Sequence, residues 1–193
     1  MFQRHGTQAY RPPHLIDHAT NMRSALDAGC DRVLAVSSVG SLHPELTVGS
    51  FACPDDFISL QASPSVFSDA RGHTTPGFDR EWREELLSTW ESKAPVPLRD
   101  GAIYWQTTGP RFETPAEIRL IAAHADVVGM TLASECIVAG EVGLRYAAVC
   151  VVDNLANGLE PEPLAIEELE RHRGVNADRL RDALASVLPA LVA

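Results

Sequence analysis

Two kinds of hydrophobic pattern alternate along the chain. Apolar residues three or four positions apart predict helices, whereas short continuous runs of apolar and β-branched residues predict buried strands. The segments with helical spacing are 12–29, 79–92, a segment that begins at Thr114-Pro115, 133–142 and about 164–192. The segments with strand character are 32–41, one or two short strands within 48–60, 101–109, 127–128 and 146–153. This alternation predicts an α/β fold with a mixed, largely parallel central sheet flanked by helices, in a single domain that spans residues 1–193.

Capping and turn-forming residues mark several boundaries of these elements. Gly29 fits the end of the first helix, and Thr114 followed by a proline fits the start of a later one. Pro54 breaks the apolar segment 48–60, and the C-terminal segment forms one long helix that is either continuous or interrupted near Gly174. The segment 61–78 is rich in Pro, Gly and Ser and predicts a long surface loop, a feature that is often functional in compact domains.

Charge and composition exclude several classes of protein. The chain carries 26 acidic and 16 basic residues, a formal net charge of −10, which is opposite in sign to that of nucleic-acid or anionic-membrane binders. No apolar run approaches the roughly 20 residues that span a bilayer, and the N-terminal residues lack the apolar segment of a secretory signal. Cys136 and Cys150 lie in apolar runs and are expected to be small buried hydrophobic residues. We expect a cytoplasmic protein with no nucleic-acid or membrane partner.

Several familiar motifs of catalysis and cofactor binding are absent from the chain. The sequence contains no GxGxxG, GxxxxGK[ST], GxSxG or HExxH motif. The four cysteines do not have the spacing of a metal site, and the seven histidines do not cluster. We therefore expect no bound metal.

The first candidate groups lie where a predicted strand ends, because ligands of open α/β sheets bind beyond the carboxyl ends of the strands. Residues 37–41 read Ser-Ser-Val-Gly-Ser, and their small side chains let backbone N–H groups approach an oxyanion. Alternatively, this segment is a polar turn. Arg4 and His5, followed by glycine, form a second candidate for anion binding, or else part of a solvated terminus.

The other strand ends combine an aromatic ring with polar groups. Phe112 and Glu113 precede a predicted helix, where a ring can stack on a planar ligand and a carboxylate can accept from its N–H groups. Alternatively, this segment caps the helix and Phe112 belongs to the core. Met130 and Thr131 offer a thioether and a hydroxyl, unless Met130 serves packing alone. The amide of Asn154 can donate and accept at the same time, or it forms an Asx turn.

Taken in order, these motifs resemble those of one enzyme family. The motifs are RHG, PPH followed by a helix with Asn21, VSSVGS, PDDFI, TTGPRFETPAEIR, DVVGMTLASE and a strand that ends in Asn154. Over nearly its whole length the chain is similar to trimeric-type purine nucleoside phosphorylases, within the branch of the 5′-methylthioadenosine and methylthioinosine phosphorylases. The resemblance implies the phosphorylase α/β fold. It also implies attack of inorganic phosphate, as co-substrate, on C1′ of a purine nucleoside through an oxocarbenium-like transition state, with no cofactor.

The resemblance also implies roles for individual residues. The residues that would bind or lie near phosphate are Arg4, His5, Ser37 and Ser38. Phe112 would stack on the purine, and Met130 would pack beneath the ribose with Thr131 alongside. His73, in the predicted loop, matches a histidine that family members lend to a neighbouring subunit's active site. That match implies a homotrimer, or a hexamer built of trimers, with composite sites.

The positions that match base contacts favour a 6-oxopurine. Adenine-preferring members carry Asp at the position of Asn154, and Ala156 stands where they have a second Asp. Glu113 matches the glutamate that 6-oxopurine enzymes use at N1–H. An oxopurine presents N1–H as donor and O6 as acceptor, so Glu113 would accept and Asn154 would donate. Asn154 would also serve N7, where charge develops as the glycosidic bond breaks. We expect inosine, guanosine or 5′-methylthioinosine as substrate, with Glu113 and Asn154 as the catalytic pair.

The sequence departs from the family pattern at several places. Family members begin some tens of residues upstream, with a strand and a Gly-rich phosphate-binding loop that the given sequence does not contain, either because its start was assigned too late or because the protein is naturally short. Ala19 stands where relatives often have Arg, and Leu132-Ala133-Ser134 replaces the usual Thr/Gly-Val/Met-Pro. Two other functions therefore stay open. One is a nucleoside-binding or scaffold relative with impaired catalysis, and the other is a hydrolase that uses water where phosphate would sit.

The pocket for the 5′ substituent would lie within residues 164–168. Leu164 and Ile166 would suit a methylthio group, whereas Glu167 or Glu168 would meet a hydroxyl. The sequence favours neither kind of substituent.

Overall fold

Two long parallel strands form the centre of the molecule. The computed structural model describes residues 2–61, 63–162 and 164–192. In it, β1 (Arg32–Ser41) pairs in parallel with β7 (Arg145–Leu155) along its whole length, with a register shift after Val39. In β7, all residues from 146 to 153 are buried. Burial on both faces explains why this strand reads as a continuous apolar run instead of an alternating one.

Five short strands extend this pair into a mixed sheet with the order β3-β5-β6-β1-β7-β2-β4. They are β2 (Phe51–Cys53), β3 (Asp56–Ser59), β4 (Arg99–Asp100), β5 (Ile103–Gln106) and β6 (Val127–Gly129). The β3–β5, β5–β6 and β2–β4 pairs are parallel, whereas β6 meets β1 and β2 meets β7 in antiparallel fashion. The predicted mixed, largely parallel sheet is confirmed, and Pro54 separates β2 from β3 as expected.

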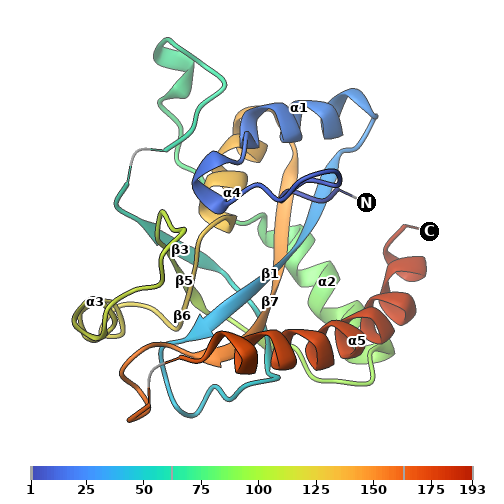
Figure 1. Cartoon of the computed structure of the whole chain (residues 1–193). Helices are drawn as coiled ribbons and strands as arrows, with labels where there is room; N and C mark the ends of the chain where they lie inside the picture. Colours follow the sequence, from blue (N-terminus) through green and yellow to red (C-terminus); the bar gives the residue numbers. More distant parts are fainter. Residues whose placement is uncertain (1, 62, 163, 193) are drawn as a thin grey trace.

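Helices cover both faces of the sheet (Figure 1). They are α1 (His18–Asp27), α2 (Arg80–Lys93), α3 (Pro115–Ile121), α4 (Leu132–Glu141) and α5 (Ile166–Leu191), with 3-10 turns η1 (Pro13–Leu15) and η2 (Ala70–Gly72). Helices α1 and α4 pack together on one face, α2 and α5 on the other, and α3 lies near the β6 side of the sheet. Within the described residues, no helix combines the length and the apolar character that crossing a membrane requires.

The apolar face of α2 forms much of the core on its side of the sheet. Trp82, Leu86 and Trp90 are buried there, as their spacing predicts. Each indole N–H donates to a backbone carbonyl, Trp82 to Val33 at 2.9 Å and Trp90 to Val96 at 2.8 Å. The rings thus contribute their large apolar area without leaving a polar atom unpaired in the core.

The C-terminal segment forms one long helix α5, as predicted, and it is not interrupted at Gly174. A glycine inside a helix costs about 1 kcal/mol relative to alanine, which tertiary contacts can offset. The amide of Asn176 supplies such contacts, because it donates to the carbonyl of Val152 at 3.2 Å and to the carboxylate of Asp153 at 2.8 Å. These bonds fasten the middle of α5 to β7.

Other expectations concern the surface loop and the cysteines. The described residues of segment 61–78 lie largely at the surface, except that Phe78 at its end is buried in the core. Glu141 accepts from the Ser65 hydroxyl of this segment at 2.8 Å and from the Val66 N–H at 2.7 Å. Cys136 and Cys150 are buried free thiols, as predicted. Burial raises the pKa of the Cys136 thiol to about 12, so it stays neutral and behaves as an apolar residue.

A buried ion pair ties the N-terminal segment to this framework. Nε and Nη2 of Arg4 donate to the two carboxylate oxygens of Glu135, both at 2.8 Å, and Nη1 donates to the carbonyl of Val36 at 2.7 Å. The Tyr146 hydroxyl donates to the same carboxylate at 2.6 Å. Burial acts to lower the pKa of Arg4, but the Glu135 carboxylate outweighs it and the pKa is raised. Burial likewise acts to raise the pKa of Glu135, yet Arg4 holds it below its usual value, so the pair stays charged.

The Tyr146→Phe substitution tests this network. It should lower the free energy of unfolding by about 1–3 kcal/mol, because it removes a donor from a buried carboxylate. Tyr10→Phe is the matched control, since Tyr10 is 73% exposed, and it should change the stability by less than about 0.5 kcal/mol. Urea unfolding measures both variants, and equal stabilities would contradict the role of the hydroxyl.

The buried His18 predicts a dependence of stability on pH. It is 6% exposed, and its Nδ1 has no hydrogen-bond partner among the described residues. Burial lowers the pKa of His18 below its ordinary value of 6.5. The unfolded chain therefore binds this proton first, and the stability falls as the pH drops below about 6.5 toward the folded-state pKa. We expect the free energy of unfolding to decrease between about pH 7.5 and about pH 5.5, and to decrease less in His18→Leu. Identical pH profiles for the two proteins would show that His18 does not cause the effect.

Candidate active site

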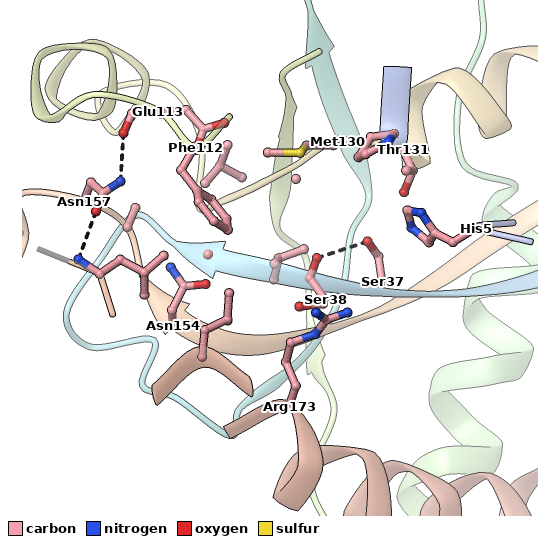
Figure 2. A pocket seen from close by; sticks show the side chains of 18 of the residues that line it. His5, Ser37, Ser38, Phe112, Glu113, Met130, Thr131, Asn154, Asn157 and Arg173 are labelled. Atoms are coloured by element: carbon pink, nitrogen blue, oxygen red, sulfur yellow. Dashed lines mark hydrogen bonds between the residues drawn. The ribbon is translucent and has the colours of Figure 1, made fainter. Parts of the chain in front are cut away.

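A cavity of about 460 Å³ lies where β1, β6 and β7 end (Figure 2). Every candidate site residue except His73 lines it. These residues are Arg4, His5, Ser37, Ser38, Phe112, Glu113, Met130, Thr131 and Asn154. The sheet topology explains this convergence, because β1 and β7 run in parallel and deliver their carboxyl ends to the same edge. Strand β6 runs the other way, so the chain that leaves it at Met130 and Thr131 passes back alongside Ser37 and Ser38.

The predicted positions of Asp153 and Asn154 need one correction. The strand was expected over 146–153 with Asn154 at its end, but β7 runs from Arg145 to Leu155 and includes both residues. Successive side chains of a strand point to opposite faces, so the two residues have different environments. Asp153 is 3% exposed and its carboxylate is bonded to Asn176, whereas Asn154 is half-buried and lines the cavity.

The segment before α3 provides the aromatic and acidic end of the cavity. Thr114 caps α3 in a capping box with Glu117, so the helix-cap interpretation of this segment is correct in part. Phe112, however, does not join the core, since it is 39% exposed and its ring borders the cavity. Glu113 is 8% exposed, and its Oε1 accepts a hydrogen bond of 2.6 Å from the Thr107 hydroxyl. The carboxylate can therefore accept from a ligand through Oε2.

Asn154 lies at the same end of the cavity, on the other side of the Phe112 ring from Glu113 (Figure 2). Its Nδ2 donates to the carbonyl of Leu155 at 2.8 Å, which leaves one N–H and Oδ1 for a ligand. Gly40 makes room for this amide, because a Cβ at that position would lie 3.2 Å from Nδ2 of Asn154. A carboxylate acceptor and an amide donor thus flank one aromatic ring.

The opposite end of the cavity carries groups suited to an anion. His5 donates from Nδ1 to the carbonyl of Arg11 at 2.9 Å, because a carbonyl can only accept, and this leaves Nε2 unused. Figure 2 shows the hydroxyl of Thr131 between His5 and Ser37. This hydroxyl does not cap α4, whose first N–H groups instead donate to the hydroxyl of Tyr104. The positive end of the α4 dipole adds to the attraction for an anion here.

Two sequence-based expectations do not fall within this cavity. His73 is exposed just after η2, and the chain does not bring it to its own cavity, so its contribution to a neighbouring site stays a prediction. For the 5′ pocket, Leu164 does line the cavity, but Ile166 is 53% exposed and lies outside it. The side chains of Glu167 and Glu168 do not line it either. Helix α5 begins at Ile166, and its helical period turns Leu169 and Arg173 toward the cavity in their place.

Sequence reasoning missed several residues that shape the site. Thr107 lies in the TTG motif and could have been proposed as a partner of the neighbouring carboxylate. Asn157 donates to the backbone carbonyl of Glu113 at 2.9 Å, but no local pattern indicates this contact. Arg173 lines the cavity, and Glu135 binds Arg4 next to it, only because of the way their helices pack. Within residues 2–61, 63–162 and 164–192, no group of three or more His, Cys, Asp or Glu side chains could hold a metal ion.

Comparisons with known proteins identify relatives of this chain. Residues 3–189 match the family described as the phosphorylase superfamily. The chain is 39% identical over 177 residues to a probable 6-oxopurine nucleoside phosphorylase of Archaeoglobus fulgidus, covering 92% of this chain and 73% of the relative. It is 38% identical over 172 residues to a probable S-methyl-5′-thioinosine phosphorylase of Methanosarcina acetivorans, covering 86% of this chain and 65% of the relative.

Solved structures show the same fold at lower sequence identity. Methylthioadenosine phosphorylase from Schistosoma mansoni, in complex with adenine, has a TM-score of 0.84 to this chain. The identity is 22%, and the match covers 98% of this chain and 76% of the other. From its sequence and its fold together, this chain belongs to the phosphorylase superfamily.

Proposed function

We propose that this protein is a purine nucleoside phosphorylase that prefers 6-oxopurine nucleosides, namely inosine, guanosine or 5′-methylthioinosine. The observation that carries the proposal is the placement of Glu113 and Asn154 on one cavity beside the exposed ring of Phe112. Relatives named as 6-oxopurine nucleoside and methylthioinosine phosphorylases support the same substrate class.

The base end of the cavity supports recognition of an oxopurine. The purine stacks on Phe112, and Oε2 of Glu113 accepts a hydrogen bond from N1–H. The free N–H of Asn154 donates to O6 and N7, on the neighbouring edge of the base. An adenine has a lone pair at N1 and an amino group at C6. Its N1 would place a hydrogen-bond acceptor against the carboxylate of Glu113, which is also an acceptor. Leaving polar groups unpaired in this way is what disfavours the wrong base.

The anion end supports the binding of hydrogen phosphate as co-substrate. The hydroxyls of Ser37, Ser38 and Thr131 offer donors to its oxygens, and the ring of His5 borders the same end of the cavity. One phosphate oxygen attacks C1′, the C1′–N9 bond breaks, and its electron pair passes to the base. The proton of hydrogen phosphate ends on the purine, and the other product is a pentose 1-phosphate. A hydrogen bond from Asn154 to N7 grows stronger as negative charge collects on the leaving base, which lowers the barrier. No step needs a metal or a cofactor.

The proposal extends to assembly and location. His73 lies outside its own cavity, so it can serve an active site only in a second copy of the chain, as expected for a homotrimer or a hexamer of trimers. A cytoplasmic location is supported by the four free cysteines, since a reducing compartment keeps thiols unpaired.

The reaction itself is the first prediction. Wild-type protein should release hypoxanthine from inosine or 5′-methylthioinosine only when phosphate is present, and should form the pentose 1-phosphate in equal amount. Chromatography of both products measures this. Free sugar in place of the sugar phosphate would indicate a hydrolase, and nucleoside binding without any release of base would indicate a binding protein. Either result contradicts the proposal.

The choice of base is the second prediction. Asn154→Asp should shift the ratio of kcat/KM for adenosine over inosine toward adenosine by about 10–100-fold, because a carboxylate accepts from the 6-amino group and cannot donate to O6. Asn21→Asp is the matched control, since Asn21 lies on α1 and does not line the cavity. An unchanged ratio in Asn154→Asp would remove Asn154 from base recognition.

A further inference from the structure

Helix α5 brings a second guanidinium to the cavity. Figure 2 shows the side chain of Arg173 rising from α5 toward Ser38. Both residues line the same cavity, together with Asn154 and Leu169. Arg173 therefore stands among the candidate ligand-binding groups, although it lies 60 residues beyond Glu113 in the sequence and belongs to none of the motifs described above.

The packing of α5 fixes the direction of this side chain. Leu169, Arg173 and Asn176 follow at intervals of four and three residues, so they share one face of the helix. Leu169 is 6% exposed and Asn176 is 3% exposed. The amide of Asn176 holds Val152 and Asp153 of β7, and His172 adds a contact of 3.2 Å from Nδ1 to the carbonyl of Asp153. The helix cannot rotate without breaking these bonds, so Arg173 stays directed at the cavity.

The other guanidinium of the cavity, that of Arg4, is already committed. Three of its five N–H groups are used by Glu135 and by the carbonyl of Val36. The carboxylate of Glu135 also balances its charge at a distance of 2.8 Å. Arg4 can still donate hydrogen bonds, but the pair offers a hydrogen phosphate dianion no net positive charge.

Arg173 is free by comparison. Its described partner is Glu170, which accepts from Nη1 at 3.0 Å, and the two side chains are 50% and 62% exposed. An ion pair this exposed contributes little, because water and salt screen it. Nε and Nη2 keep their donors for a ligand. A fork of this kind matches the oxygens of a phosphate, which can displace Glu170.

The sheet makes both sides of the anion site accessible. Strand β6 pairs with β1 only at Gly40 and Ser41, so in the described part of the chain residues 32–39 of β1 have a strand neighbour on the β7 side alone. Ser37 and Ser38 point to opposite faces of β1 at this edge. An anion bound there can therefore be reached by His5 on the side of Ser37 and by Arg173 on the side of Ser38.

We propose that Arg173 binds the phosphate co-substrate and supplies the uncompensated positive charge of the anion site. The inference rests on the proposed function and adds to it a phosphate-binding residue on α5. It also separates two roles, since Arg4 becomes a positioning residue that holds the N-terminal segment beside β1, whereas Arg173 makes the charge-bearing contact.

The test compares Arg173→Gln and Arg173→Lys with wild type and with Arg171→Gln. Arg171 is the matched control, because it lies on the same helix, pairs with Glu168 at 3.5 Å and does not line the cavity. Calorimetric titration measures the binding of inorganic phosphate, with and without hypoxanthine, and the binding of hypoxanthine alone. Initial rates give KM for phosphate and for nucleoside separately.

Arg173→Gln should weaken phosphate binding by about tenfold or more and raise KM for phosphate to match, since it removes a charged donor pair. Arg173→Lys should recover part of the loss, because it keeps the charge without the fork. Hypoxanthine affinity and KM for nucleoside should stay as in wild type, and Arg171→Gln should resemble wild type throughout. Unchanged hypoxanthine affinity also shows that each variant is folded.

Equal phosphate affinity in wild type and Arg173→Gln overturns the inference. So does a raised KM for nucleoside with an unchanged KM for phosphate, which would assign Arg173 to the sugar. The proposed function fails separately, by the absence of base release from the wild-type protein. The phosphate titration still decides the role of Arg173 in that case, because it needs no turnover.

Discussion

The parallel pairing of β1 with β7 is the constraint on which the rest of the structure depends. It brings Ser37 and Ser38 to the same edge as Asn154, although more than a hundred residues separate them in the chain. The apolar run of β7 stabilises the pairing, because burial on both faces removes its apolar surface from water. The position of the cavity follows from this pairing, and the short strands and loops around it decide its chemistry.

The main role of the ion pair between Arg4 and Glu135 is to hold the N-terminal segment in place and not to add binding affinity for a ligand. Taking two charges out of water has a cost that their attraction and hydrogen bonds must offset, and here Tyr146 and the carbonyl of Val36 complete the set of partners. What the pair provides is a defined place for the N-terminal segment, with His5 held against the end of the cavity. A positioning function of this kind explains why a charged residue near the chain end is buried at all.

Much of the fold could be predicted because its signals are local. The apolar run 32–41 matches β1, the tryptophan face matches α2, and Thr114 caps α3 as its type and position indicate. Other features depend on tertiary contacts. Gly174 has a poor helix propensity, but the bonds of Asn176 to β7 override it, and these bonds cannot be seen in a local pattern. The direction of the Arg173 side chain depends on the same tertiary contacts. The order of the sequence motifs therefore predicted most of the residues that line the cavity, but not the residues of α5 that face it.

The absence of a side chain at Gly40 limits how this site can change during evolution. A methyl group there would come within 3.2 Å of both the Asn154 amide nitrogen and a methyl of Val128. The side chain of Asn154 thus occupies space that is left open because Gly40 has no side chain. Substitutions at these two positions should be epistatic, since an exchange tolerated at one depends on the occupant of the other. Lineages that acquire a new preference at position 154 are therefore expected to keep glycine at position 40.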